Sequence, residues 1–248
     1  MCFKLINDCC GNMNKSERAA FEKKLMFGFT ALTILGFLME IIAVSTDSWL
    51  LFYIEGGLYQ NATSKYIHRV YSGLWRICKV TRTKNDDPST EATKCDYHNF
   101  FPTTKEIIYD KSIDQQILDY MRTGCAFSII SMTLMFLVHL FAVYTIRRPR
   151  YTIKRLTALL HFMTAACIVV MNEVFIRTTE YADEHLPARI PRKAEHDYGY
   201  SFVLSWIVFV FYLCAGVVFL FLSQKRKAKM ADSDDDLAVE DEPVRLRR

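Results

Sequence analysis

Residues 200–222 read YSFVLSWIVFVFYLCAGVVFLFL, a run without one formally charged side chain. A helix of about 20 apolar residues, rising about 1.5 Å per residue, is long enough to cross the hydrocarbon core of a bilayer. This stretch therefore predicts a transmembrane helix. It argues against an ordinary soluble domain, although a chain of 248 residues could by length form one or two of these.

Three further apolar runs, at residues 25–44, 124–146 and 156–176, have a similar length. The first contains only Glu40 as a formal charge, and the third contains Glu173 near its end. One such run could be a buried helix of a globular core, but four of them predict an all-α membrane four-helix bundle over residues 25–222.

Basic residues flank these runs on one side. They lie before the first run, in the short link between the second and third, and after the fourth: Lys15, Arg18, Lys23, Lys24; Arg147, Arg148, Arg150, Lys154, Arg155; Lys225, Arg226, Lys227, Lys229. Because lysine and arginine near span ends are retained in the cytoplasm, both termini, 1–24 and 223–248, are expected to be cytoplasmic. Residues 45–123 and 177–199 then form extracellular loops.

The predicted topology sorts the eight cysteines. Cys78 and Cys95 alone fall outside the cell, where two cysteines most simply form a disulfide with each other. A zinc site is disfavoured there because, besides His98, no second pair of ligands has suitable spacing. Three others lie in spans and three in the cytoplasm, where palmitoylation is an alternative to a free thiol: Cys125, Cys167, Cys214; Cys2, Cys9, Cys10.

The first loop is too long to be a simple connection. Its aromatic and β-branched segments, separated by turn-forming residues, predict a small extracellular antiparallel β-sheet. Asn61-Ala62-Thr63 is an N-glycosylation sequon in the same loop. Residues 112–122 carry apolar side chains at helical spacing, so we expect them to begin the second helix above the membrane.

Residues 71–80 of this loop read YSGLWRICKV. Gly73 would allow a bulge or a close backbone approach, while Leu74 and Trp75 would pack on the sheet or on the tops of the helices. Trp49, just past the first span, suits an anchor at the level of the lipid headgroups. Alternatively, Trp49 and the GLWRIC residues form only the structural core of a small loop domain, and we favour this second interpretation.

A tryptophan after the first span, then GLW, a cysteine and a second cysteine together resemble the signature of the claudin superfamily. Here these residues are Trp49, Gly73-Leu74-Trp75, Cys78 and Cys95. The longer pattern S-GLWR-x-C, with HNFFP at 98–102 and YGYSFVLSW at 198–206, is similar to voltage-dependent calcium channel gamma subunits, including the AMPA-receptor regulatory group.

The resemblance implies an auxiliary plasma-membrane subunit that modulates gating or trafficking of a voltage-gated calcium channel or an ionotropic glutamate receptor. Its partners would be a pore-forming subunit in the same membrane and the lipid bilayer. The end PVRLRR departs from the regulatory group, because it lacks the apolar last residue that a PDZ domain binds. The acidic tail around Ser233 is either a solvated segment or a phosphorylation site.

Resemblance to claudins proper implies an alternative, a cell-adhesion or paracellular barrier protein. The first loop carries six bases that could select anions: Lys65, Arg69, Arg76, Lys79, Arg82, Lys84. A glycan at Asn61 would obstruct close packing of sheets between cells.

No catalytic, cofactor-binding or metal-binding pattern is found, and nothing points to an enzyme or to nucleic acid. Carboxylates within spans are costly and therefore functional candidates, so Glu40 and Glu173 are possible contacts for a partner. Alternatively, Glu40 bonds a neighbouring helix, and Glu173 pairs with Arg177, four residues further on.

Overall fold

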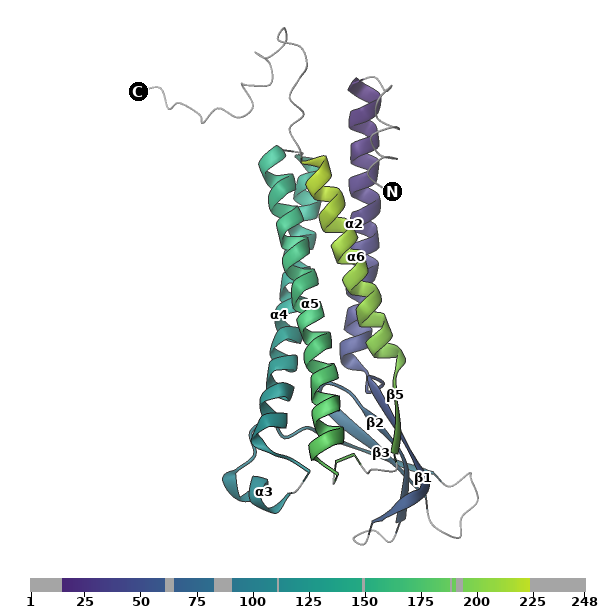
Figure 1. Cartoon of the computed structure of the whole chain (residues 1–248). Helices are drawn as coiled ribbons and strands as arrows, with labels where there is room; N and C mark the ends of the chain where they lie inside the picture. Colours follow the sequence, from purple (N-terminus) through teal and green to yellow (C-terminus); the bar gives the residue numbers. More distant parts are fainter. Residues whose placement is uncertain are drawn as a thin grey trace.

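The computed structural model has four long helices side by side, with a β-sheet at one end (Figure 1). It describes residues 15–60, 65–82, 91–110, 112–148, 150–187, 189–190 and 194–223. Each long helix is apolar and long enough to cross a membrane. The four are α2 (Lys15–Ser45), α4 (Gln115–Arg147), α5 (Tyr151–His185) and α6 (Tyr200–Leu222).

The four helices close into a ring of neighbours, with α4 on α5, α5 on α6, α6 on α2 and α2 on α4. The start of α2, the link between α4 and α5, and the last turn of α6 all lie at the end away from the sheet, here called the far end (Figure 1). The predicted four-helix membrane bundle is therefore confirmed.

The sheet has five antiparallel strands in the order β4-β3-β2-β1-β5. Four of them come from the first loop and confirm the sheet predicted there: β1 (Leu50–Gln60), β2 (Lys65–Ser72), β3 (Arg76–Arg82) and β4 (Ala92–Tyr97). The fifth, β5 (Ala194–Tyr198), comes from the second loop and pairs with β1 from Leu50 to Ile54. This strand was not predicted, because AEHDY has neither the length nor the apolar alternation of a typical strand.

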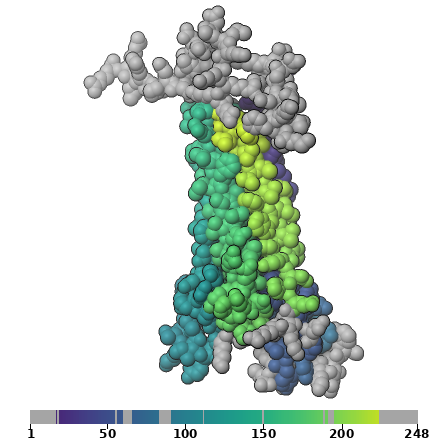
Figure 2. Space-filling view, viewed as in Figure 1, coloured from purple at the N-terminus to yellow at the C-terminus, as the bar shows by residue number. Residues whose placement is uncertain are grey.

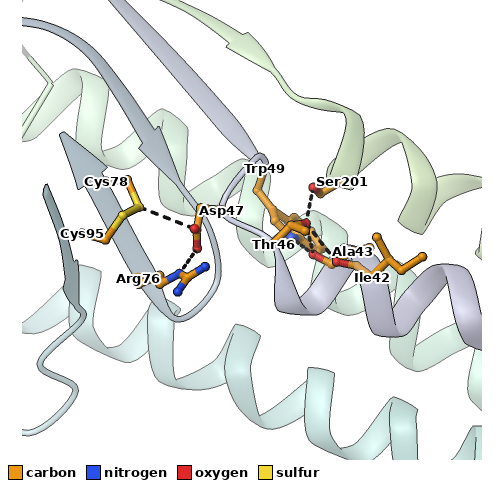
Figure 3. Close-up of polar contacts among 9 residues, drawn as sticks. All are labelled: Ile42, Ala43, Thr46, Asp47, Trp49, Arg76, Cys78, Cys95 and Ser201. Carbon is orange, nitrogen blue, oxygen red and sulfur yellow. Dashed lines mark hydrogen bonds and ion pairs between the residues drawn. A yellow bond between two sulfur atoms is a disulfide. The ribbon is translucent and has the colours of Figure 1, made fainter. Parts of the chain in front are cut away.

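Trp49 lies at the junction between the helices and the sheet. Its side chain is 0% exposed, and its indole Nε1 donates a hydrogen bond to the carbonyl of Ala43 at 2.6 Å (Figure 3). The ring also packs against Phe175 of α5 and Phe202 of α6. Of the two interpretations, the headgroup anchor is wrong and the structural core agrees with the structure: Trp49 is enclosed, and its indole finds its polar partner inside the protein.

The short segment 46–49 that joins α2 to β1 is held from both sides. The amide of Trp49 donates to the carbonyl of Ser72, and the amide of Ser201 donates to the carbonyl of Ser48. An added Cβ at Gly73 would lie 2.7 Å from the carbonyl oxygen of Thr46, and one at Gly199 only 2.0 Å from that of Ser48. Glycine at these two positions lets three backbone segments pass in contact.

The second transmembrane helix begins at Gln115, where the side chain of Asp114 caps it by accepting from the amide of Ile117 at 2.8 Å. The predicted start at residue 112 is thus close to the observed one. A short helix, α3 (Thr104–Tyr109), precedes it, although the sequence around Pro102 was interpreted as a turn.

One of the basic residues at the far end is buried. The Lys154 ammonium lies 3.2 Å from Glu22 Oε2 of α2 and donates to the carbonyl of Leu222 at the end of α6. Because α5 thereby contacts both terminal helices, this lysine contributes to the closure of the bundle as well as to the basic flank.

Replacing Gly199 or Gly73 by alanine should destabilise the protein by about 1–3 kcal/mol or more, because the new Cβ collides with backbone that has no room to move. Gly28→Ala is the matched control, since nothing lies within 4 Å of that position in α2, and it should be neutral or stabilising by up to about 1 kcal/mol. Thermal unfolding in detergent measures all three; equal midpoints would contradict the close approach.

Replacing Cys78 and Cys95 by serine should lower stability by about 3 kcal/mol, the value expected for closing a loop of this size. Cys214→Ser, which changes an exposed free cysteine of α6, should leave the unfolding midpoint unchanged. A double variant as stable as the parent would show that the strand pairing alone holds β3 and β4 together.

Candidate interaction surface

A disulfide joins the edge strand β4 to its neighbour β3. Cys78 of β3 and Cys95 of β4 are direct partners in the antiparallel register, and their sulfur atoms are bonded (Figure 3). In the part of the chain that the structure describes, the only group of three potential metal ligands is these two cysteines with Asp47. Since both sulfurs are committed to the disulfide, no thiolate is left for a metal ion.

The residues of the GLWR motif connect the disulfide-bonded strands to the helices. Leu74 is buried in the core, while Trp75 is half-buried and meets Phe100 edge-on at 6.3 Å between ring centroids. Arg76 Nε donates to Asp47 Oδ1 at 2.5 Å, so the motif is tied to the segment that joins α2 to β1 (Figure 3). These residues position the sheet, and their role here is architectural.

The bases of the sheet are mostly opposed by acids. Besides the Arg76–Asp47 pair, Arg82 pairs with Glu91, and Lys94 lies 3.4 Å from Asp96. The guanidinium of Arg69 stands over the ring of Tyr53, and Lys79 lines a cavity described below. The side chains of Lys65 and Lys84 lie outside the described residues. The described part of the sheet therefore offers no broad face of unopposed positive charge for selecting anions.

A set of strongly exposed apolar side chains lies along the segment from the last residue of β4 to the end of α3. We call it the α3 patch; its members, with their exposed fractions, are Tyr97 (78%), Phe101 (81%), Ile108 (72%) and Tyr109 (86%). No residue of α3 is buried, and the helix projects below α4 away from the bundle (Figures 1 and 2). Exposed apolar patches of this kind mark sites of contact with proteins or membranes.

Local hydrogen bonds order α3 in place of packing. Thr103 and Glu106 form a capping box, in which each side chain bonds the backbone of the other residue. Arg122 of α4 donates to the carbonyl of Phe100 at 2.8 Å and stands over the ring of Phe101. The α3 patch is thus presented by a fixed backbone while its apolar side chains remain uncovered.

Glu40 lies inside the bundle and is 0% exposed. Ser205 Oγ of α6 is 3.3 Å from Glu40 Oε1 and 2.9 Å from Asn172 Oδ1 of α5. Because a hydroxyl has one proton, both bonds form best with the Asn172 amide turned over, so that its NH₂ donates to Ser205 and Ser205 donates to Glu40. Glu40 therefore links three helices, and its proposed contact with a partner is wrong because other helices enclose it.

Glu173 is exposed on the outer surface of α5, and its expected pairing with Arg177 is not formed. Arg177 instead pairs with Glu180 at 2.8 Å. Glu173 and Glu180 lie four residues before and three residues after Arg177, and in the structure Arg177 pairs with Glu180, the one nearer the end of the helix. Asn61 and Ser233 lie outside the described residues.

Sequence reasoning missed the α3 patch. Tyr97 and Phe101 come from KCDYHNFF at 94–101, and Ile108 and Tyr109 come from KEIIYD at 105–110, where no helix was predicted. The one available signal was the capping box Thr-x-x-Glu at Thr103 and Glu106, which marks the start of a helix.

Comparison with known proteins bears directly on this architecture. Residues 34–221 match the family described as PMP-22/EMP/MP20/Claudin tight junction. The human voltage-dependent calcium channel gamma-7 subunit is 28% identical over 217 residues, which cover 86% of this chain and 74% of that protein.

Two other relatives are more distant. The mouse voltage-dependent calcium channel gamma-5 subunit is 25% identical over 213 residues, covering 81% of this chain and 69% of its own. Human epithelial membrane protein 2 is 21% identical over 157 residues, which cover 63% of this chain and 80% of that protein. With the four helices, the sheet and the disulfide in place, this chain belongs to the PMP-22/EMP/MP20/claudin family, on the side of the calcium channel gamma subunits.

Proposed function

We propose that this protein is an auxiliary membrane subunit that binds a pore-forming channel subunit and modulates its gating or trafficking. The observation that carries the proposal is the α3 patch, an ordered apolar surface at the sheet end that the protein's own fold leaves uncovered. Similarity to the gamma-7 and gamma-5 subunits favours a voltage-gated calcium channel as the partner. An ionotropic glutamate receptor is the second candidate from the sequence resemblance.

In the proposed orientation the protein lies in the plasma membrane, with both termini in the cytoplasm and the sheet outside the cell. The basic residues around the α4–α5 link support it, because such residues are retained on the cytoplasmic side. The disulfide at the sheet end supports the same side assignment, since disulfides persist in oxidising compartments. Glycosylation of Asn61, detected as a gel shift on amidase treatment, would test this orientation.

Modulation requires that the subunit bind one channel state better than another, because a ligand shifts an equilibrium only by its differential affinity. The α3 patch would contact the outer part of the channel, and the exposed outer surface of α5 would contact its membrane domain. On that surface Glu173 would meet a polar group of the partner, since an exposed carboxylate in a span is otherwise costly.

Affinity purification of the native protein in a mild detergent, followed by mass spectrometry, tests the proposal. Recovery of a pore-forming calcium-channel or glutamate-receptor subunit in stoichiometric amount is the expected result, and it names the target. Recovery of junctional proteins, or only of further copies of this chain, would contradict it and favour adhesion.

The double substitution Ile108→Ser and Tyr109→Ser should reduce recovery of the pore-forming subunit about tenfold or more, because apolar anchors at the centre of an interface contribute most of the affinity. Both side chains are exposed, so the fold should be retained. Tyr59→Ser, at an exposed tyrosine on β1 away from the patch, is the control and should leave recovery unchanged. If Tyr59→Ser reduced recovery of the pore-forming subunit and the double variant did not, the contact would instead lie on the hairpin of β1 and β2.

A further inference from the structure

A cavity of about 490 Å³ lies between the sheet and the segment that leads into α4. A smaller cavity of about 50 Å³ adjoins it at the sheet end of the helices. The two cavities share the lining residues Phe52, Ile77, His98 and Arg189. The larger volume is within the range of small-molecule sites, about 300–1,000 Å³. None of the α3 patch except Tyr97 lines it.

The wall of the larger cavity is mainly apolar and comes from three strands. β1, β2 and β3 contribute aliphatic and aromatic side chains, and the segment before α4 contributes one more: Phe52, Ile54, Leu58, Ile67, Val70, Ile77, Ile113. A continuous apolar wall of this kind suits a hydrocarbon chain.

Arg189 places a positive charge at the junction of the two cavities. Two backbone hydrogen bonds fix its turn, since the amides of Arg189 and Ile190 both donate to the carbonyl of Leu186. Its guanidinium Nη2 donates to Met121 Sδ at 3.5 Å, and no carboxylate in the described residues comes within 4.0 Å of the guanidinium. Surrounding protein atoms desolvate the guanidinium and lower the pKa of Arg189, with the charge of Asp110 acting in the opposite direction.

Among the described residues that line the cavity, the ionisable groups leave one excess positive charge. Lys79 adds a second cation, and Asp110 adds one anion, whose carboxylate accepts from the backbone amide and hydroxyl of Ser112. Burial, with the nearby charge of Arg189, lowers the pKa of His98 to about 4, so its ring is neutral at pH 7. A desolvated guanidinium without a carboxylate partner is costly, and an anionic ligand group would offset that cost.

We propose that this cavity binds a single-chain anionic amphiphile, of the class of long-chain carboxylates. The ligand's head would accept two parallel hydrogen bonds from the Arg189 guanidinium, which suits planar carboxylates, and its chain would lie along the strand side chains. One negative charge matches the excess positive charge of the lining. The site shares only Tyr97 with the α3 patch and involves neither Ile108 nor Tyr109, so it is tested separately from the proposed channel partner.

The test uses the full chain in phosphatidylcholine nanodiscs, with displacement of fluorescent cis-parinarate by oleate as the readout and empty nanodiscs as background. We expect oleate to displace the probe, and oleyl alcohol, which lacks the charge, to do so at least about tenfold more weakly. This comparison needs no variant. Equal displacement by the two compounds, or no displacement by oleate, would overturn the proposal.

Arg189→Gln should weaken oleate about tenfold or more, because it removes a charged hydrogen-bond donor. Arg69→Gln is the matched control, because Arg69 is exposed over Tyr53 and does not line the cavity. If the Arg189→Gln and Arg69→Gln variants bound oleate with equal affinity, the proposed role of Arg189 would be contradicted. Nanodiscs containing phosphatidylglycerol then distinguish the source: displacement by oleate alone supports the single-chain carboxylate, and displacement by this two-chain phospholipid would contradict it.

Discussion

The burial of Trp49 is the contact on which the sheet and the helices jointly depend. Its indole bonds the carbonyl of Ala43 within α2, its ring touches α5 and α6, and its backbone pairs with β2 and with Gly199. Removing a buried tryptophan side chain typically costs about 3–5 kcal/mol. Because the same residue ends α2 and begins β1, any movement of the sheet relative to the bundle would disrupt these contacts together.

This constraint explains why the GLWR sequence is needed. The Thr46–Trp49 segment can reach its buried position only if the residue after β2 has no Cβ, and Gly73 meets that requirement. Arg76 then bonds Asp47 of the same segment, and the disulfide at Cys78 fixes the next strand. The motif is therefore the sheet's attachment to the membrane helices.

The sequence predicted the parts of this structure that depend on long, regular patterns. The uncharged run at 200–222 and its three counterparts predicted the bundle, and the position of Cys78 and Cys95 predicted their bond. For Trp49 the sequence left a headgroup anchor and a structural core both open, because its position at the end of a span cannot show whether α6 will cover the ring. β5 was missed because it pairs with β1, more than a hundred residues earlier, and Arg189 was missed because its contact with Met121 joins residues 68 apart; no local pattern records either contact.

The polar interior of the bundle bears on how such a subunit could act on a partner. Glu40, Ser205 and Asn172 bond α2, α5 and α6 together, while Thr145 of α4 bonds Thr157 of α5. Polar links between helices fix their register, because a shift of one turn would leave each of these groups buried without a partner. A partner held at the α3 patch would thus meet a body that moves as one unit. Differential binding to channel states would then arise from how well this rigid outline fits each state.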